Sequence, residues 1–345
     1  MSLLKYYIIM ENEDAEENYR NLLESGTEDK DFEIAEENLK RFFPDVPVED
    51  ALHLLQSNQV FKEMLQMIQK AFIKWYNWNP GEIIINQKNQ NSIISYAVTE
   101  ADFPMFIHIG SLLDSTIFSF MAIMLKWAKA AECNLSEQGC FNQLLYTMNE
   151  MALMGLLPAD SGKEAVLGDI IDDIQLQNLA SDCYWAMLLF TASHEMAHIY
   201  QMSTNPAYWL SHRSEAESNA DYIGYDILLH LIMEPEDQNL RMEEYAYLAP
   251  MMFMDMFELI FYTDELLYGS KTSHGYHGNP EERKEKLFDQ VDDEKYQFDT
   301  TLGNSVYQSF LDSYDRYCDM LQKYKADHRI DSIIHLQERK ERTHL

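Results

Sequence analysis

The sequence predicts an α+β protein that is predominantly helical, with a small antiparallel β-sheet and one helix that carries an HExxH motif. Beyond residue 110, apolar residues recur almost everywhere at helical spacing. Three short β-branched or aromatic segments between residues 80 and 110 are separated by polar turn segments, which is typical of a sheet. The chain has 345 residues, of which 46% are hydrophobic, so it can bury a substantial core.

Acidic residues outnumber basic ones by 58 to 26, which gives a formal net charge of −32. A field of this sign repels nucleic acids and anionic membranes and favours basic protein partners. Neither of the two longest apolar stretches, 107–127 and 245–262, is free of charges and helix breakers over the ~18 residues that a membrane span needs. The four cysteines show no metal-binding spacing, which predicts free thiols. We therefore expect a cytoplasmic protein that binds neither nucleic acid nor membrane.

Residues 1–79 are predicted to form an acidic helical N-terminal region. Acids cluster at 11–17 and 28–37, which is typical of solvated helix faces. After a break at 43–47, apolar residues of 48–75 recur near helical spacing. The pattern changes at Asn79-Pro80-Gly81, where we place the domain boundary.

Residues 80–290 are predicted to form the core. It begins with strands at 82–86, 92–98 and 105–109, which we expect to pair as an antiparallel sheet. Helices follow at 112–131, 141–157, 182–201, 214–230 and 241–268. Segment 158–178 is poorly patterned and is a candidate lid. Residues 291–345 are predicted to form a C-terminal helical region.

His194, Glu195 and His198 form the HExxH motif within the predicted helix 182–201. On a helix, residues four apart differ by about 40° in direction and about 6 Å in rise, so both imidazoles can converge on one ion. Glu195 is then placed to accept a proton from water at that ion. An ordinary buried helix segment is the alternative, but it would leave three polar side chains in need of partners, which a metal supplies.

Glu217 and Asp221 form an ExxxD motif on the second predicted helix, nineteen residues beyond the HExxH motif. Two histidines, one carboxylate and an open position are the usual ligands of catalytic zinc, which makes Glu217 the candidate third ligand. Asp221, one turn later, could accept the second ring N–H of a ligating histidine. Glu215 and His212 remain alternatives for the third ligand.

HExxH followed by ExxxD, with the ending Ala220-Asp221-x-x-Gly224, resembles the gluzincin metallopeptidases. The likeness is nearest to the Ste24/HtpX-like peptidases and to the phage-exclusion peptidases of the Lit type. Residues 273–287 are similar to the His-Pro…Arg…Leu segment of those families, with Pro280 standing three residues after His277.

The resemblance implies a zincin-like catalytic core and peptidase activity. It also implies a hydrogen-bond donor that stabilises the oxyanion of the reaction. The candidates are His277, taken as a catalytic residue, together with His274, Tyr276 and Arg283. The Lit-type likeness implies a phage-defence or toxin-like protease that acts when an infection signal arrives.

The sequence thus predicts a zinc-dependent intracellular endopeptidase of narrow specificity. Zn²⁺ would be held by His194, His198 and Glu217, with Glu195 as the base and Asp221 behind the ligands. The expected partners are a protein substrate and an activating protein. The alternative is a catalytically silent metal-binding regulatory or scaffold protein that uses its acidic surface to recruit a partner.

Overall fold

The structure of the chain is a computed structural model. It describes residues 57–81, 83–88, 96–98, 105–129, 136–152, 174–206, 213–234, 244–269, 279–291 and 300–327. The elements in these ranges are α5 (Ser57–Tyr76), β1 (Ile83–Lys88), β2 (Tyr96–Val98), β3 (Met105–Gly110), α6 (Ser111–Ala128), α7 (Glu137–Ala152), α8 (Ile174–Thr204), α10 (Arg213–Met233), η3 (Glu244–Leu248), α11 (Ala249–Tyr268), α12 (Pro280–Val291) and α13 (Thr300–Asp327).

Helix α8 lies at the centre of the fold. Every residue from 186 to 199 is buried. The helix packs against α5, α6, α10 and α11, and also against η3 and strands β2 and β3. A helix covered on all sides is largely apolar, and the buried part of α8 has this character apart from one face that carries His194, His198 and Gln201. It begins at Ile174, within the segment 158–178 that the sequence marks as a candidate lid, and it ends just before Pro206.

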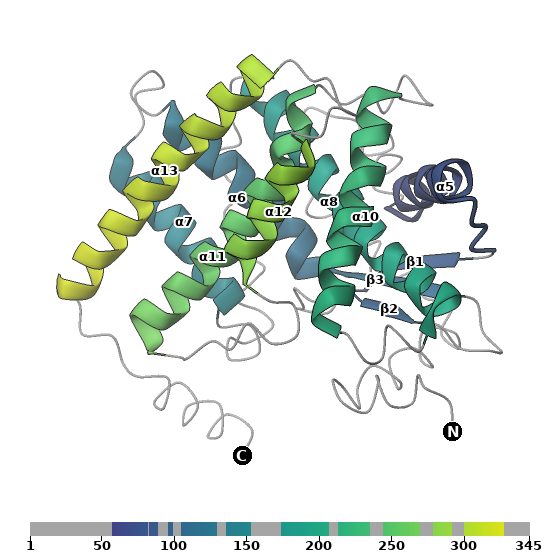
Figure 1. Cartoon of the computed structure of the whole chain (residues 1–345). Helices are drawn as coiled ribbons and strands as arrows, with labels where there is room; N and C mark the ends of the chain where they lie inside the picture. The colour runs from purple at the N-terminus through teal and green to yellow at the C-terminus, as the bar shows by residue number, and fades with distance from the viewer. Residues whose placement is uncertain are drawn as a thin grey trace.

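The remaining elements surround α8 and its neighbour α10. Figure 1 shows α5 and the sheet on one side of this pair, and α7, α11 and α13 on the other. Helix α13 packs on α6, α7, α11 and η3. The predicted N-terminal and C-terminal regions are described only over α5 and over α13 with the end of α12. Within the described ranges, no helix has both the length and the apolar character that crossing a membrane requires.

The predicted fold class is wrong in its sheet. Strand β1 runs parallel to β3, whereas β2 runs antiparallel to β3, so the order is β1-β3-β2 and the sheet is mixed. The antiparallel sheet expected for a zincin-like α+β core is therefore not present in the described residues, which are overwhelmingly helical. Turn residues mark where strands stop, but pairing direction depends on the path of the chain between strands, which local composition does not record.

Candidate metal centre

Close packing of α10 on α8 brings the two predicted motifs together. A Cβ at Gly224 would lie 2.9 Å from the backbone nitrogen of His194 and 3.1 Å from its Cα. Only glycine allows two backbones to approach this closely without a shift of one of them. Glu217 precedes Gly224 by two helical turns, so it projects from the same side of α10 toward α8.

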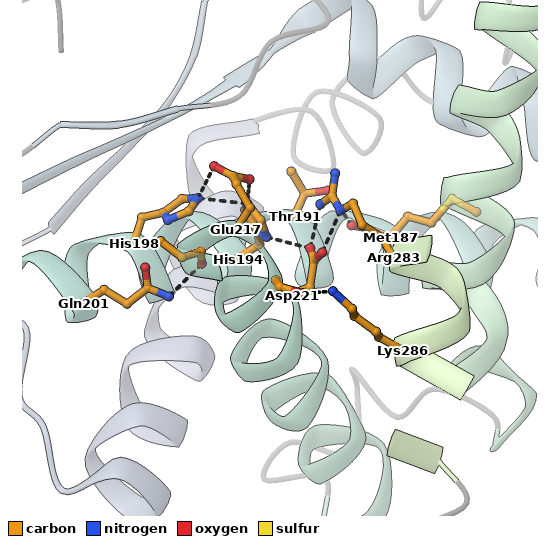
Figure 2. Close-up of polar contacts among 11 residues, drawn as sticks. Met187, Thr191, His194, His198, Gln201, Glu217, Asp221, Arg283 and Lys286 are labelled. Atoms are coloured by element: carbon orange, nitrogen blue, oxygen red, sulfur yellow. Dashed lines mark hydrogen bonds and ion pairs between the residues drawn. The ribbon is translucent and has the colours of Figure 1, made fainter. Parts of the chain in front are cut away.

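The side chains of His194, His198 and Glu217 converge on one point, as Figure 2 shows. The two imidazole Nε2 atoms lie 3.0 Å apart. Glu217 Oε2 lies 3.5 Å from His194 Nε2, and Glu217 Oε1 lies 3.3 Å from His198 Nε2. Among the described residues, no other group of histidines, cysteines and carboxylates is arranged to hold a metal ion.

These separations fit a tetrahedral metal ion. Ligand bonds of about 2.0–2.1 Å at tetrahedral angles place ligand atoms about 3.3–3.4 Å from one another. The two Nε2 atoms lie 3.0 Å apart, and each lies 3.3 or 3.5 Å from a different oxygen of the Glu217 carboxylate, so these separations are close to that value. Two imidazoles and a carboxylate are also donors that zinc accepts. The residues present therefore suit zinc in both geometry and chemistry.

Asp221 contacts the side of the His194 ring that faces away from the other two candidate ligands. Its Oδ1 lies 2.9 Å from His194 Nδ1, so it contacts the ring nitrogen that faces away from His198 and Glu217. Arg283 of α12 clamps the same carboxylate from the other side. Its Nε and Nη2 each donate a hydrogen bond of 2.6 Å to one oxygen of Asp221. A bidentate pair of this kind fixes the orientation of the carboxylate, and hence that of the imidazole.

The electrostatics of the site favour a cation. Burial alone would lower the pKa of His194, but hydrogen bonds and charges of Asp221 and Glu217 outweigh it and raise the pKa to about 10. Burial would raise the pKa of Asp221, but Arg283 and His194 lower it to about 2, so this carboxylate is ionised. The negative field that retains a proton on His194 also favours a divalent ion, which competes with that proton.

Glu195 adds to this field. It is buried, with 6% of its surface exposed. Burial alone would lower the pKa of Arg283. The charges of neighbouring carboxylates, which include Glu217 and Glu195, outweigh burial and raise this pKa. Three buried carboxylates beside one guanidinium leave two net negative charges when the imidazoles are neutral, which a divalent ion would balance.

Helix α12 is tied to α10 along its length. Besides the Arg283 pair, Lys286 Nζ donates to Ser218 Oγ at 2.7 Å, and Gln290 Nε2 donates to the Tyr222 carbonyl at 3.0 Å. The opposite side of α12 is anchored by Lys284, whose Nζ lies 2.6 Å from Asp255 Oδ1 on α11. Adjacent basic residues thus bind carboxylates on two different helices. This arrangement holds Arg283 in position against Asp221.

Helix α5 braces both ligand-bearing helices from the other side. Tyr76 donates a hydrogen bond of 2.9 Å to Asp226 Oδ2 on α10. Trp75 stacks on His230 of α10, with ring centroids 4.2 Å apart. Tyr76 also meets the ring of Tyr200, two residues after His198 on α8, with centroids 5.7 Å apart. These contacts fix the C-terminal half of α10 relative to α8.

The structure places the other predicted site residues as follows. Glu215, the alternative carboxylate, is exposed in the first turn of α10. The remaining candidates lie outside the described residues, and they are His212, His274, Tyr276 and His277. Their predicted roles stay predictions.

Sequence reasoning missed Gln201. This residue follows His198 by three positions on α8, is 8% exposed, and donates a hydrogen bond of 3.0 Å from Nε2 to the Ala216 carbonyl. Helical spacing could have found it, because residues 194, 198 and 201 share one face. The HExxH pattern itself marks only charged or metal-binding side chains on that face, so it gives no signal for an amide.

Comparison of the chain with protein-family models, with curated proteins and with solved structures finds no match. The site is therefore defined by its own geometry. That geometry shows a helical protein in which His194, His198 and Glu217 lie together, as in an HExxH-type site, and can hold a metal ion.

Proposed function

We propose that this protein is a zinc-dependent endopeptidase that hydrolyses a peptide bond of a protein substrate. The observation that carries the proposal is the convergence of the two HExxH imidazoles with Glu217. This set provides three protein ligands from the described residues, whereas structural zinc is normally closed by four, often with cysteine among them. A zinc ion held by three protein ligands typically activates water for hydrolysis.

Each residue of the site has a distinct role in this proposal. His194, His198 and Glu217 hold zinc, which when bound supplies a Lewis acid that polarises a carbonyl and lowers the pKa of water. Glu195 accepts the proton of the attacking water and delivers it to the leaving amine. Asp221 Oδ1, 2.9 Å from His194 Nδ1, would accept the proton on that nitrogen, which would leave Nε2 to face the ion.

The oxyanion of the reaction needs a hydrogen-bond donor. Arg283 already uses Nε and Nη2 on Asp221, so any such role for this residue rests on Nη1. His277, His274 and Tyr276 are the other proposed donors, on the family resemblance. In each case the donor would act on the substrate carbonyl and would not bind the metal.

We further propose that the substrate range is narrow and that the partner surface is basic. The three ligands and Glu195 are only 6–9% exposed, so a substrate must insert a segment into a confined site. The net charge of −32 attracts basic surfaces and raises their encounter rate. A phage-defence or toxin-like role, in which an activating protein opens the site, follows from the Lit-type resemblance.

The test is to incubate the zinc-loaded protein with casein and with cell lysate, beside a Glu195→Gln variant. We expect casein to survive and one or a few lysate proteins to disappear only with the unaltered protein, which mass spectrometry would then identify. Rapid cleavage of casein and of many lysate proteins would contradict narrow specificity. Identical lysates with both proteins, across a panel that includes phage-infected cells, would favour a metal-binding protein without turnover.

A further inference from the structure

Gln201 of α8 contacts α10 at the residue immediately before Glu217, the third proposed ligand. Its Nε2 donates to the carbonyl of Ala216, and the carbonyl carbon of Ala216 is bonded directly to the backbone nitrogen of Glu217. Figure 2 shows the Gln201 side chain reaching from α8 toward α10 beside His198. The contact is buried, because Gln201 is 8% and Ala216 is 2% exposed.

Two contacts of different kinds bracket the metal ligands along the helix pair. At one end, Gly224 lies against the backbone of His194 and sets how closely the helices approach. That contact, like those of α5, lies at or beyond the middle of α10 and does not by itself set the position of its N-terminal end. At the other end, Gln201 bonds to the carbonyl of Ala216 in the N-terminal part of α10, immediately before Glu217.

We propose that Gln201 is a positioning residue for Glu217, acting through the Ala216 peptide. The inference rests on the metal site proposed above. Because a carboxylate must lie within a few tenths of an ångström of its place to bind zinc well, a small roll of α10 would weaken the third ligand while leaving both histidines in position. The residue itself does not touch the metal.

The other end of the amide supports a role beyond stability. Gln201 Oε1 is buried and has no hydrogen-bond partner among the described residues. A buried acceptor without a partner costs stability, and an apolar side chain of similar size would avoid that cost. Glutamine at this position is therefore better explained by the donor that it presents to Ala216 than by the stability of the core.

The experiment compares Gln201→Leu with Tyr225→Phe in the full chain, using Co²⁺ as the probe. Tyr225 also donates from a buried side chain to a backbone carbonyl, that of Tyr247 at 2.9 Å, and it is not among the converging ligands. Affinity for Co²⁺ is measured by chelator competition, coordination by the visible absorption spectrum, and stability by the Tm of the metal-free protein.

We expect Gln201→Leu to bind Co²⁺ about tenfold or more weakly, as loss of an outer partner of a metal ligand does, with an altered visible spectrum. Its Tm should fall no further than that of Tyr225→Phe, because each variant loses one buried donor to a backbone carbonyl. Tyr225→Phe should lower the Tm but leave affinity and spectrum unchanged, because the donor that it removes acts on the Tyr247 carbonyl and not on the peptide before Glu217. Gln201→Asn keeps an amide but withdraws it by one methylene, so it should reproduce the weakened binding if the leucine variant fails to fold.

Unchanged affinity and spectrum in a folded Gln201 variant would overturn the positioning role while leaving the metal site intact. Failure of the unaltered protein to bind Co²⁺ would overturn both the site and this inference. The parent measurement therefore distinguishes the two failures. Equal weakening in Tyr225→Phe would also count against the proposal, because it would show that any loss of packing disturbs the site.

Discussion

Replacing Glu195 with glutamine should abolish hydrolysis while leaving the metal in place. The substitution keeps the size of the side chain and removes only its capacity to accept a proton. A positioned general base contributes about 10²–10⁴-fold to such reactions, so the rate on the substrate identified from lysate should fall by at least that factor. Metal content and Tm should match those of the parent, because Glu195 is not one of the three converging ligands.

Glu285→Gln is a suitable control for this experiment. Glu285 is an exposed carboxylate on α12, so its loss changes the net charge by the same amount without touching the site. Turnover by Glu195→Gln at the parental rate would show that this residue is not the base. Loss of metal together with activity would instead place Glu195 among the ligands.

Gly224→Ala should disrupt the metal site by forcing the backbones of α8 and α10 apart. The added Cβ would lie 2.9 Å from the His194 nitrogen and 3.3 Å from the Phe190 carbonyl oxygen, both of which belong to α8. Main-chain atoms in a buried helix cannot turn aside as a flexible side chain can, so α10 must move. We expect the free energy of unfolding to fall by about 1–3 kcal/mol, as overpacking typically costs, and metal affinity to fall as well.

Gly139→Ala serves as the matched control for that substitution. Gly139 is exposed near the start of α7, and a Cβ there would meet only Ser136 at an ordinary distance of 3.7 Å. Alanine favours a helix over glycine by up to about 1 kcal/mol, so this variant should be as stable as the parent or slightly more so. Denaturant unfolding and chelator competition measure both effects. A Gly224→Ala protein with unchanged stability and affinity would contradict the close approach of the two helices.

The core of the site could be predicted from the sequence because it depends on local periodicity. The spacing of His194 and His198 fixes their shared face on any helix, and the structure brings Glu217 to that face as the ExxxD pattern suggested. Asp221 contacts His194, as the one-turn offset from Glu217 predicted. These relations need only the 3.6-residue repeat and the ligand preferences of zinc.

The features that could not be predicted depend on which elements become neighbours. Helical spacing predicts that Gly224 faces α8. It does not predict how closely Gly224 approaches the backbone of His194. The pairing of Arg283 with Asp221 joins residues 62 positions apart and requires the path of α12. The parallel pairing of β1 with β3 has the same origin, because the third strand in the chain takes the central place in the sheet.

Metal analysis of the purified protein tests the central claim most directly. About one zinc per chain should be found in the parent, and the metal should be lost in His194→Ala, His198→Ala and Glu217→Ala, since each removes one of three converging ligands. Each variant should be compared with the parent by chelator competition and by circular dichroism, so that loss of metal is separated from loss of fold. A parent protein that takes up no stoichiometric zinc, or variants that retain it at parental affinity, would contradict the account.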